Sequence, residues 1–183
     1  WRRRTRGIDL TRFVFLDESG AKTNMTRLYG RVFGGQRLVD TAPHGHWCST
    51  TILSSIRLDG STAAMVIEGA TDTSVFRAYV EHVLIPSLRP RDIVVLDNLA
   101  PHKHPEILQM LERSGVRVWH LPPYSPDFNP IEKMWSKLKA HLRKAKARNP
   151  QALLRAIARA LKNVTAGDAA AWFHHCGYRY VQS

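Results

Sequence analysis

Short, unbroken apolar runs mark the predicted strands of this chain. Residues 13–16 and 93–96 are entirely apolar, and an aspartate follows each run. Runs of this kind are typical of strands that are buried on both faces of a sheet. Together with three further runs, they predict five strands, at residues 12–16, 29–33, 50–58, 93–97 and 116–121. The glycine-containing pairs at 34–35 and 59–60 favour turns, so the first three strands should form an antiparallel meander.

Apolar residues at helical spacing predict the helices between and after these strands. Residues 71–73 supply cap side chains for a helix that runs to Leu88, and Gly115 ends a second helix near Ser114. Later helices are expected at residues 129–148, 153–161 and, briefly, 172–173. The resulting order, β-β-β-α-β-α-β-α, predicts an α/β domain of the ribonuclease-H-like kind. Its mixed five-stranded sheet would combine the meander with parallel strands and be flanked by helices.

Residues 121–142 join a proline-rich loop to a basic amphipathic helix. Asn129 suits the N-cap, Pro130 suits the first helical position, and Glu132 falls in the first turn. Apolar residues recur on one face of this helix, at Ile131, Trp135, Leu138 and Leu142. Glu132 lies beside that face, where it is either a cap or a metal ligand. The spacing from Asn129 to Glu132 is that of a capping box, which keeps the first alternative open.

Three carboxylates of this sequence could converge on one site. Asp17 and Asp97 each end a predicted buried strand, and Glu132 begins a helix. Ligand sites of α/β sheets lie outside the carboxyl ends of the strands. These three side chains are therefore candidate ligands for metal ions.

The residues around the three acids resemble those of a known family. The matching segments are 15–19 (FLDES), 96–103 (LDNLAPHK) and 121–132 (LPPYSPDFNPIE), and 34 residues, 98–131, separate the second acid from the third. Segments and spacing resemble those of DDE transposases, in the bacterial insertion-sequence branch of the mariner superfamily. The likeness runs from about Asp9 to Tyr180, and it implies a ribonuclease-H-like catalytic domain over residues 9–183.

This resemblance implies a metal-dependent reaction on DNA. Two Mg²⁺ ions, for which Mn²⁺ would substitute, are expected on Asp17, Asp97 and Glu132, with Asp17 bridging the pair. The implied activity is cleavage and strand transfer at the ends of an insertion sequence. Double-stranded DNA, both element ends and target, is the expected partner, and a homodimer is the expected active complex. The neighbouring acids Glu18 and Asp127 are expected to point elsewhere or to cap.

The resembling family also carries a DNA-recognition region before its catalytic domain. Residues 1–8 are basic, and we expect them to be a linker from such a region. They would either touch DNA phosphates or be solvated. Because the chain begins at Trp1 and not at Met, we expect it to be a piece of a longer protein.

The charge of the chain favours a polyanionic partner. It has 27 Lys and Arg against 15 Asp and Glu, a formal net charge of +12. A basic protein without such a partner has the same composition, so charge alone decides little. The basic residues of the expected helix at 129–148 either form a solvated face or contact phosphates. Candidate DNA contacts are Lys22, Asn98, His102, Lys133, Lys137, Lys139, Arg143 and Lys144.

The two cysteines and the hydropathy bear on the compartment. Cys48 and Cys176 are expected to be free thiols in a reducing compartment, because no signal peptide is apparent. No apolar run approaches the roughly 20 residues of a membrane span. We therefore expect a cytoplasmic protein, associated with a bacterial nucleoid.

Three functions remain open from the sequence. The first is a DDE transposase catalytic domain. The second is a domesticated or fragmentary relative that binds DNA without cutting it, against which the intact acidic triad argues. The third is another ribonuclease-H-like nuclease, acting on RNA in hybrids or on branched DNA. The segment at 125–132 and the spacing of the acids favour the first function over the third.

Overall fold

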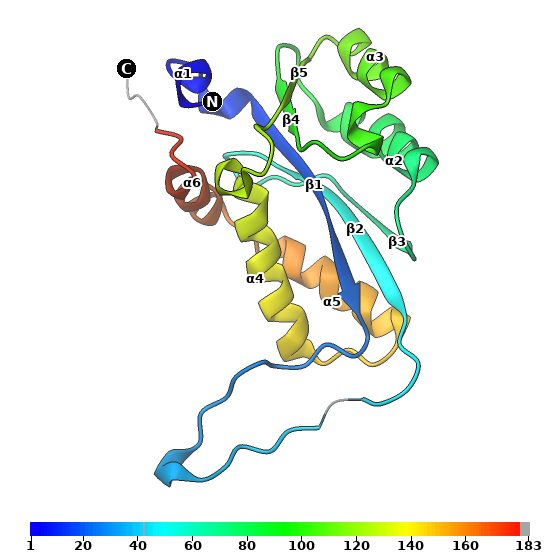
Figure 1. The fold of residues 1–183 in the computed structure, drawn as a ribbon, viewed down its shortest axis with the longest axis vertical. Helices are drawn as coiled ribbons and strands as arrows, with labels where there is room; N and C mark the ends of the chain where they lie inside the picture. Colours follow the sequence, from blue (N-terminus) through cyan, green and yellow to red (C-terminus); the bar gives the residue numbers. More distant parts are fainter. Residues whose placement is uncertain (42, 180–183) are drawn as a thin grey trace.

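A five-stranded mixed sheet forms the centre of the molecule (Figure 1). The computed structural model describes residues 1–41 and 43–179; the last four residues of the expected catalytic domain lie outside this range. The strand order is β3-β2-β1-β4-β5, with antiparallel β1–β2 and β2–β3 pairs and parallel β1–β4 and β4–β5 pairs. The strands are β1 (Phe13–Lys22), β2 (Ser49–Ile56), β3 (Ala64–Glu68), β4 (Ile93–Leu96) and β5 (Arg117–His120). The predicted architecture, an antiparallel meander beside parallel strands, is confirmed.

Two of the predicted strands are corrected by the structure. The strand expected at residues 29–33 is wrong, because this segment lies in an exposed loop with Tyr29 at 90% and Phe33 at 98% exposure. The third strand of the meander is instead β3, which pairs with β2 after the turn at residues 59–60. The sequence signal for β3 is weak because it is an edge strand of five residues that are at most half-buried.

The first strand is longer than the sequence predicts. β1 does not end with Asp17 but continues to Lys22, because β2 pairs with it throughout, with Asp17 opposite Ser54. On its other side, β1 pairs with β4 only as far as Phe15 opposite Val95. Asp17 therefore lies where one neighbouring strand has ended and the other continues. An opening beside Asp17 follows from that arrangement.

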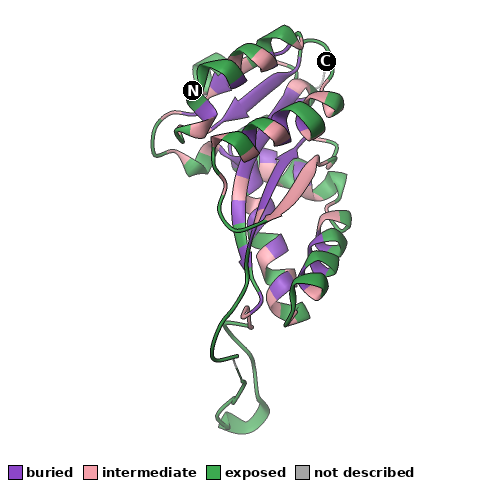
Figure 2. Cartoon of the chain, turned by 90° about the vertical axis from the view of Figure 1, so that its right-hand side faces the viewer, coloured by how far each residue is buried: buried purple, intermediate pink, exposed green. Residues whose placement is uncertain are grey.

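Helices cover both faces of the sheet (Figures 1 and 2). Phe13 and Phe15 of β1 belong to a core with α4, α5 and α6, whereas Val14 and Leu16 belong to a core with α2 and α3. This alternation is the period of two expected of a strand buried on both faces. The α-helices are α1 (Arg2–Thr5), α2 (Thr73–Tyr79), α3 (Pro105–Arg113), α4 (Pro130–Ala145), α5 (Pro150–Lys162) and α6 (Ala166–His175).

Helix ends differ from the predictions at a few positions. The helix predicted to run to Leu88 is α2, followed by a π-helical turn at Val80–Leu84 and a 3₁₀ turn at Ile85–Ser87. α4 ends at Ala145 because Lys146 has a φ of 48°. The short helix expected at 172–173 is the whole of α6, whose N-terminus is fixed by a Thr165–Asp168 capping box.

Residues 23–41 and 43–48 form a long arm between β1 and β2 that projects from the body of the molecule (Figures 1 and 2). Its stems are attached to the end of α4. Arg148 Nη1 donates to the carbonyl oxygens of Thr23, at 3.1 Å, and Met25, at 2.9 Å. Lys146 Nζ pairs with Asp40 at 2.6 Å. Every described residue from 27 to 41 is exposed, so the arm contributes nothing to the core.

No helix among residues 1–41 and 43–179 is long and apolar enough to cross a membrane. Cys48 is exposed and Cys176 is buried, and both are free thiols, as expected.

Candidate active site

Asp17, within β1, and Asp97, directly after β4, lie at the same edge of the sheet. β1 and β4 run parallel with Phe15 opposite Val95, and two residues further along each chain come Asp17 and Asp97. Residues two apart on a strand lie on the same face, so both acids lie on the face of Phe15 and Val95. These two residues belong to the core that packs on α4. The predicted juxtaposition on adjacent parallel strands is confirmed.

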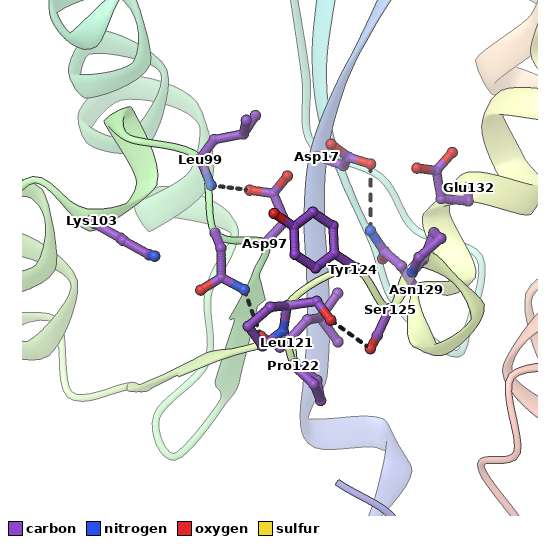
Figure 3. A pocket seen from close by; sticks show the side chains of 13 residues that line it. Asp17, Asp97, Leu99, Lys103, Leu121, Pro122, Tyr124, Ser125, Asn129 and Glu132 are labelled. Atoms are coloured by element: carbon purple, nitrogen blue, oxygen red, sulfur yellow. Dashed lines mark hydrogen bonds between the residues drawn. The ribbon is translucent and has the colours of Figure 1, made fainter.

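A cavity of about 490 Å³ opens at this edge and brings the third acid to the first two (Figure 3). Its walls are the end of β4 and the loop after it, the proline-rich loop at 121–126, and the first turn of α4. Asp17, Asp97 and Glu132 all line it, and Figure 3 shows Asp17 between the other two. Glu132 comes from α4, whose apolar face, including Ile131, Trp135 and Leu138, is buried against the sheet.

Asp17 is the most buried acid of the site, with only 7% of its surface exposed. Burial, and then the negative charges of Glu132 and Asp97, raise the pKa of Asp17 to about 7, against the lowering effect of its hydrogen bond with Glu18 N. That backbone N–H donates to Asp17 Oδ1 at 2.7 Å. A carboxylate in this position is costly to ionise, and a bound cation would relieve that cost.

Asp97 has the opposite electrostatic balance. Burial raises its pKa, but hydrogen bonds from His102 and from the backbone N–H of Leu99 outweigh burial and hold the pKa below its usual range. His102 Nδ1 lies 2.5 Å from Asp97 Oδ1, and Leu99 N lies 2.9 Å from the same oxygen (Figure 3 shows the second bond). Asp97 is therefore poised as an anion.

Glu132 is not part of a capping box. The N-cap residue Asn129 makes no side-chain cap hydrogen bond. Its Nδ2 points instead to Asp17 Oδ2, at 3.4 Å, and its Oδ1 is buried without a hydrogen-bond partner (Figure 3). Within the described residues, the Glu132 carboxylate has no hydrogen bond or ion pair, and the residue is exposed. The alternative that kept Glu132 as a cap is wrong, and its carboxylate is free to bind a ligand.

The carboxylate oxygens of this cavity are candidate ligands for divalent cations. Mg²⁺ prefers hard oxygen ligands and keeps several waters, so one or two carboxylates for each ion suffice. In the part of the chain that the structure describes, no three His, Cys, Asp or Glu side chains are close enough to hold one ion together. A closed three-ligand cage is thus not formed. Asp17, placed between Asp97 and Glu132, is the carboxylate that both pairs would share.

Comparison with known proteins identifies the family. The sequence profile of the DDE superfamily endonuclease family matches residues 12–154. The chain belongs to this family. No curated protein matches the sequence significantly.

Solved structures share the fold of this DDE endonuclease family member. The Mos1 transposase paired-end complex with left transposon end matches with a TM-score of 0.73 at 16% identity, covering 94% of this chain and 54% of that chain. The Mos1 strand transfer complex matches with a TM-score of 0.70 at 20% identity and the same coverage. The catalytic domain of Mos1 mariner transposase matches with a TM-score of 0.61 at 16% identity, covering 94% and 80%. This chain spans about half the length of the full Mos1 chains, and the likeness confirms the ribonuclease-H-like fold.

The structure separates the candidate DNA contacts of this DDE endonuclease into different environments. His102 is fully buried, so its side chain is not presented to a DNA molecule. Asn98 lines the cavity, and its Nδ2 donates to Leu121 O at 2.7 Å, which joins the ends of β4 and β5. Lys137 Nζ lies 2.5 Å from Asp168 Oδ2 and 3.0 Å from Asn163 O, so it connects α4 to α6. His102 and Lys137 therefore have structural partners that the sequence did not reveal.

The remaining basic candidates stay open to a ligand. Lys22 is exposed at the far end of β1, 5.8 Å from the ring of Trp47. Lys144 is exposed, whereas three others on α4 are half-buried: Lys133, Lys139 and Arg143. Arg143 and Lys144 line a second cavity, of about 490 Å³, with Arg27, Leu28 and Tyr29 from the arm. None of these residues is brought to the acidic cavity.

Three residues of the acidic cavity were not singled out from the sequence as site residues. Asn129 reaches Asp17 across 112 positions, which no local pattern reveals. Lys103 is an exposed cation in the cavity wall, within the matching segment 96–103. Tyr124 is fully exposed at the cavity wall with a φ of 54°, between Pro123 and the 3₁₀ turn at Pro126–Phe128. A positive φ at a residue other than glycine costs about 1–3 kcal/mol, and such strain concentrates at functional sites.

Proposed function

We propose that this chain is the catalytic domain of a DNA transposase, of the bacterial insertion-sequence branch of the mariner superfamily. Its activity is metal-dependent cleavage and strand transfer at the element ends. The observation that carries the proposal is the cavity in which Asp17 lies between Asp97 and Glu132. Membership of the DDE superfamily endonucleases and the fold shared with Mos1 transposase support it.

The three acids have different roles in this proposal. Two Mg²⁺ ions, or Mn²⁺ in their place, would stabilise the attacking and leaving oxygens of a phosphodiester when bound here. Asp17 and Asp97 would hold one ion, and Asp17 and Glu132 would hold the other. Glu18 and Asp127 take no part, since neither lines the cavity. No protein nucleophile is needed, because water and then a DNA 3′-hydroxyl are the attacking groups.

Double-stranded DNA is the proposed substrate, as element end and as target. The net charge of +12 favours such a partner, and the open cations on α4 and near the arm would neutralise phosphates. Binding is then expected to weaken steeply with salt. Residues 1–8 would connect this domain to a preceding DNA-recognition region, in a cytoplasmic protein of the bacterial nucleoid.

A homodimer is the proposed active complex, and the arm supports it. Large apolar side chains of the arm are exposed, among them Leu28, Tyr29, Phe33 and Val39. Exposed apolar groups of this extent are typical of a surface that another molecule covers. Deleting residues 27–40 should convert a dimer to a monomer in sedimentation equilibrium on DNA-end complexes. An undiminished dimer would remove the arm from this role.

Nicking by the full-length protein tests the proposal. Asp97→Asn is nearly isosteric but lacks the charge that holds a divalent ion, so it should abolish Mg²⁺-dependent nicking of the element ends while DNA binding stays within about threefold. Asp127→Asn is the matched control, because Asp127 is an exposed acid of the segment between β5 and α4 that does not line the cavity. It should nick at the wild-type rate.

Two other results would point to the other functions. A wild-type protein that binds element ends but never nicks them would be a catalytically silent relative. Preferential cleavage of RNA in hybrids, or of branched DNA, would indicate another ribonuclease-H-like nuclease. An Asp97→Asn protein that nicks at the wild-type rate would contradict the two-ion reaction itself.

A further inference from the structure

A buried histidine contacts one of the three acids from behind. His102 is fully buried, in the 3₁₀ turn at Pro101–Lys103 that follows β4, and its Nδ1 lies 2.5 Å from Asp97 Oδ1. A carboxylate is only an acceptor when ionised, so Nδ1 carries the hydrogen of this bond. His102 does not line the cavity and cannot reach a DNA molecule there.

The two oxygens of Asp97 are unequal as a result. Oδ1 accepts from His102 Nδ1 and from the backbone N–H of Leu99, at 2.9 Å. Within the described residues, Oδ2 has no hydrogen-bond partner. With both lone-pair directions of Oδ1 engaged, the oxygen left for a cation in the cavity is Oδ2. The arrangement therefore favours binding through one oxygen of Asp97.

The surroundings of His102 fix the imidazole in place. The ring of Phe76, from α2, lies 4.4 Å from the imidazole centroid at an interplanar angle of 40°. The His102 carbonyl oxygen is 3.3 Å from His120 Nε2, at the end of β5. On the other edge of the ring, Nε2 is buried and has no hydrogen-bond partner among the described residues. A buried polar atom without a partner is costly, and it implies that the position needs the Nδ1 side of the ring.

We propose that His102 is the positioning residue of the site: it turns Asp97 so that Oδ2 alone faces the metal ions. The inference rests on the function proposed above and adds a residue to it. Mutating a residue that hydrogen-bonds to a metal ligand typically weakens metal affinity about 10–100-fold. His102 acts only through Asp97, so its loss should weaken metal binding and leave the rate at saturating metal nearly unchanged.

Two amide variants of His102 distinguish positioning from packing. His102→Asn keeps an N–H donor near the place of Nδ1, whereas His102→Gln moves the donor toward the place of Nε2, away from Asp97. Each removes the ring from the contact with Phe76, so a packing role would damage both variants alike. A positioning role would spare the first and impair the second.

Metal titrations of this chain give the decisive readout. The rise of melting temperature with added Mn²⁺ yields an apparent Kd, and melting in EDTA measures the fold alone. We expect His102→Gln to weaken the apparent Kd about 10–100-fold and His102→Asn to stay within about threefold of wild type. Nicking should show the same split, with a higher Mn²⁺ requirement for His102→Gln and a maximal rate within about threefold of wild type.

The outcomes separate this inference from the proposed function. Equal apparent Kd values for wild type and His102→Gln would overturn the positioning role while leaving the acidic site in place. A wild-type chain without any Mn²⁺ response would overturn both proposals. If both variants unfold, ring-nitrogen NMR of the wild-type chain decides: His102 protonated at Nδ1, with a shift on Mg²⁺ addition, supports the role, and protonation at Nε2 alone contradicts it.

Discussion

The side-chain amide of Asn129 lies against the carboxylate of Asp17, with Nδ2 3.4 Å from Oδ2. Both residues are buried, at 4% and 7% exposure. The contact joins the start of α4 to the middle of β1, and it connects the elements that carry Glu132 and Asp17. Asn129 gives up the capping bond that its position would allow, and its Oδ1 stays unpaired. The start of α4 therefore lacks a side-chain cap, and the Asn129 side chain instead contacts an acid of the cavity.

Replacing Asn129 with aspartate should make the fold depend on metal. Asn129→Asp keeps the size of the side chain but sets a fourth carboxylate against Asp17, and the repulsion removes the existing hydrogen bond. We expect the metal-free protein to lose about 1–3 kcal/mol of stability at pH 8. Urea denaturation with and without Mn²⁺ measures the effect, and Mn²⁺ should restore most of it. Equal losses in both conditions would show that this contact is unrelated to a metal site.

The raised pKa of Asp17 predicts the pH dependence of the metal-free protein. The folded-state pKa of about 7 exceeds the usual value of 3.8, so the folded state binds the proton more tightly than the unfolded state. The resulting stability is fully present below pH 4 and is lost as the pH rises through 7. The loss is on the order of 4 kcal/mol, at 1.36 kcal/mol for each pKa unit.

Asp17→Asn should therefore stabilise the metal-free chain at pH 8 while abolishing nicking. The amide is uncharged at every pH, so burial does not penalise it. Its contribution to the free energy of unfolding, measured by urea denaturation, should be nearly the same at pH 5 and pH 8. Asp127→Asn, at an exposed acid, is again the control and should leave the wild-type pH dependence unchanged. An Asp17→Asn protein less stable than wild type at pH 8 would show that the carboxylate is a structural acid.

Lys137 and Lys144 lie on the same helix but should respond differently to alanine. Lys137 pairs with Asp168, and that hydrogen bond, followed by those of Thr165, lowers the pKa of Asp168 to about 2. Lys137→Ala should cost about 0.5–1 kcal/mol of stability, present above pH 4 and lost toward pH 2, with little effect on DNA binding. Lys144, exposed beside the arm, makes no ion pair in the described part of the chain.

Lys144→Ala should weaken binding to every DNA sequence. The slope of log K against log salt is negative, and each lost phosphate contact makes it shallower by about 0.9. Fluorescence anisotropy at several salt concentrations measures the slope for both variants, and thermal melting supplies the stability. A slope that becomes shallower for Lys137→Ala but not for Lys144→Ala would reverse the assignment of the two lysines.

Features that depend on local pattern could be predicted from the sequence. The runs ending at Asp17 and Asp97 are apolar because both faces of β1 and β4 are covered, so the strands and their acids are readable directly. The apolar stripe of α4 similarly predicts which face is buried and where Glu132 falls. The segment at 29–33 has strand-like residues, yet the described part of the arm offers no neighbouring strand to pair with it.

Features that depend on distant contacts could not be predicted in this way. The contact of Asn129 with Asp17 spans 112 positions of the sequence. Whether the Asn129 side chain caps α4 or contacts Asp17 therefore depends on the tertiary structure. His102 follows Asp97 by five residues, but only the packing of Phe76 shows that its ring is turned inward. The sequence around Lys137 is typical of a solvated or DNA-binding helix face. In the structure, Lys137 instead pairs with Asp168 of the α6 capping box.

Anomalous diffraction from crystals soaked in Mn²⁺ can show whether the three carboxylates bind a pair of metal ions. We expect two Mn²⁺ peaks in the acidic cavity, both within about 2.0–2.6 Å of Asp17 oxygens, one also bound by Asp97 and the other by Glu132. The peaks should disappear in Asp17→Asn crystals of the same form and persist with Asp127→Asn. The contrary result would be crystals in which Mn²⁺ binds elsewhere and the cavity is empty, although protein dissolved from them still nicks DNA. It would contradict a metal site at these acids.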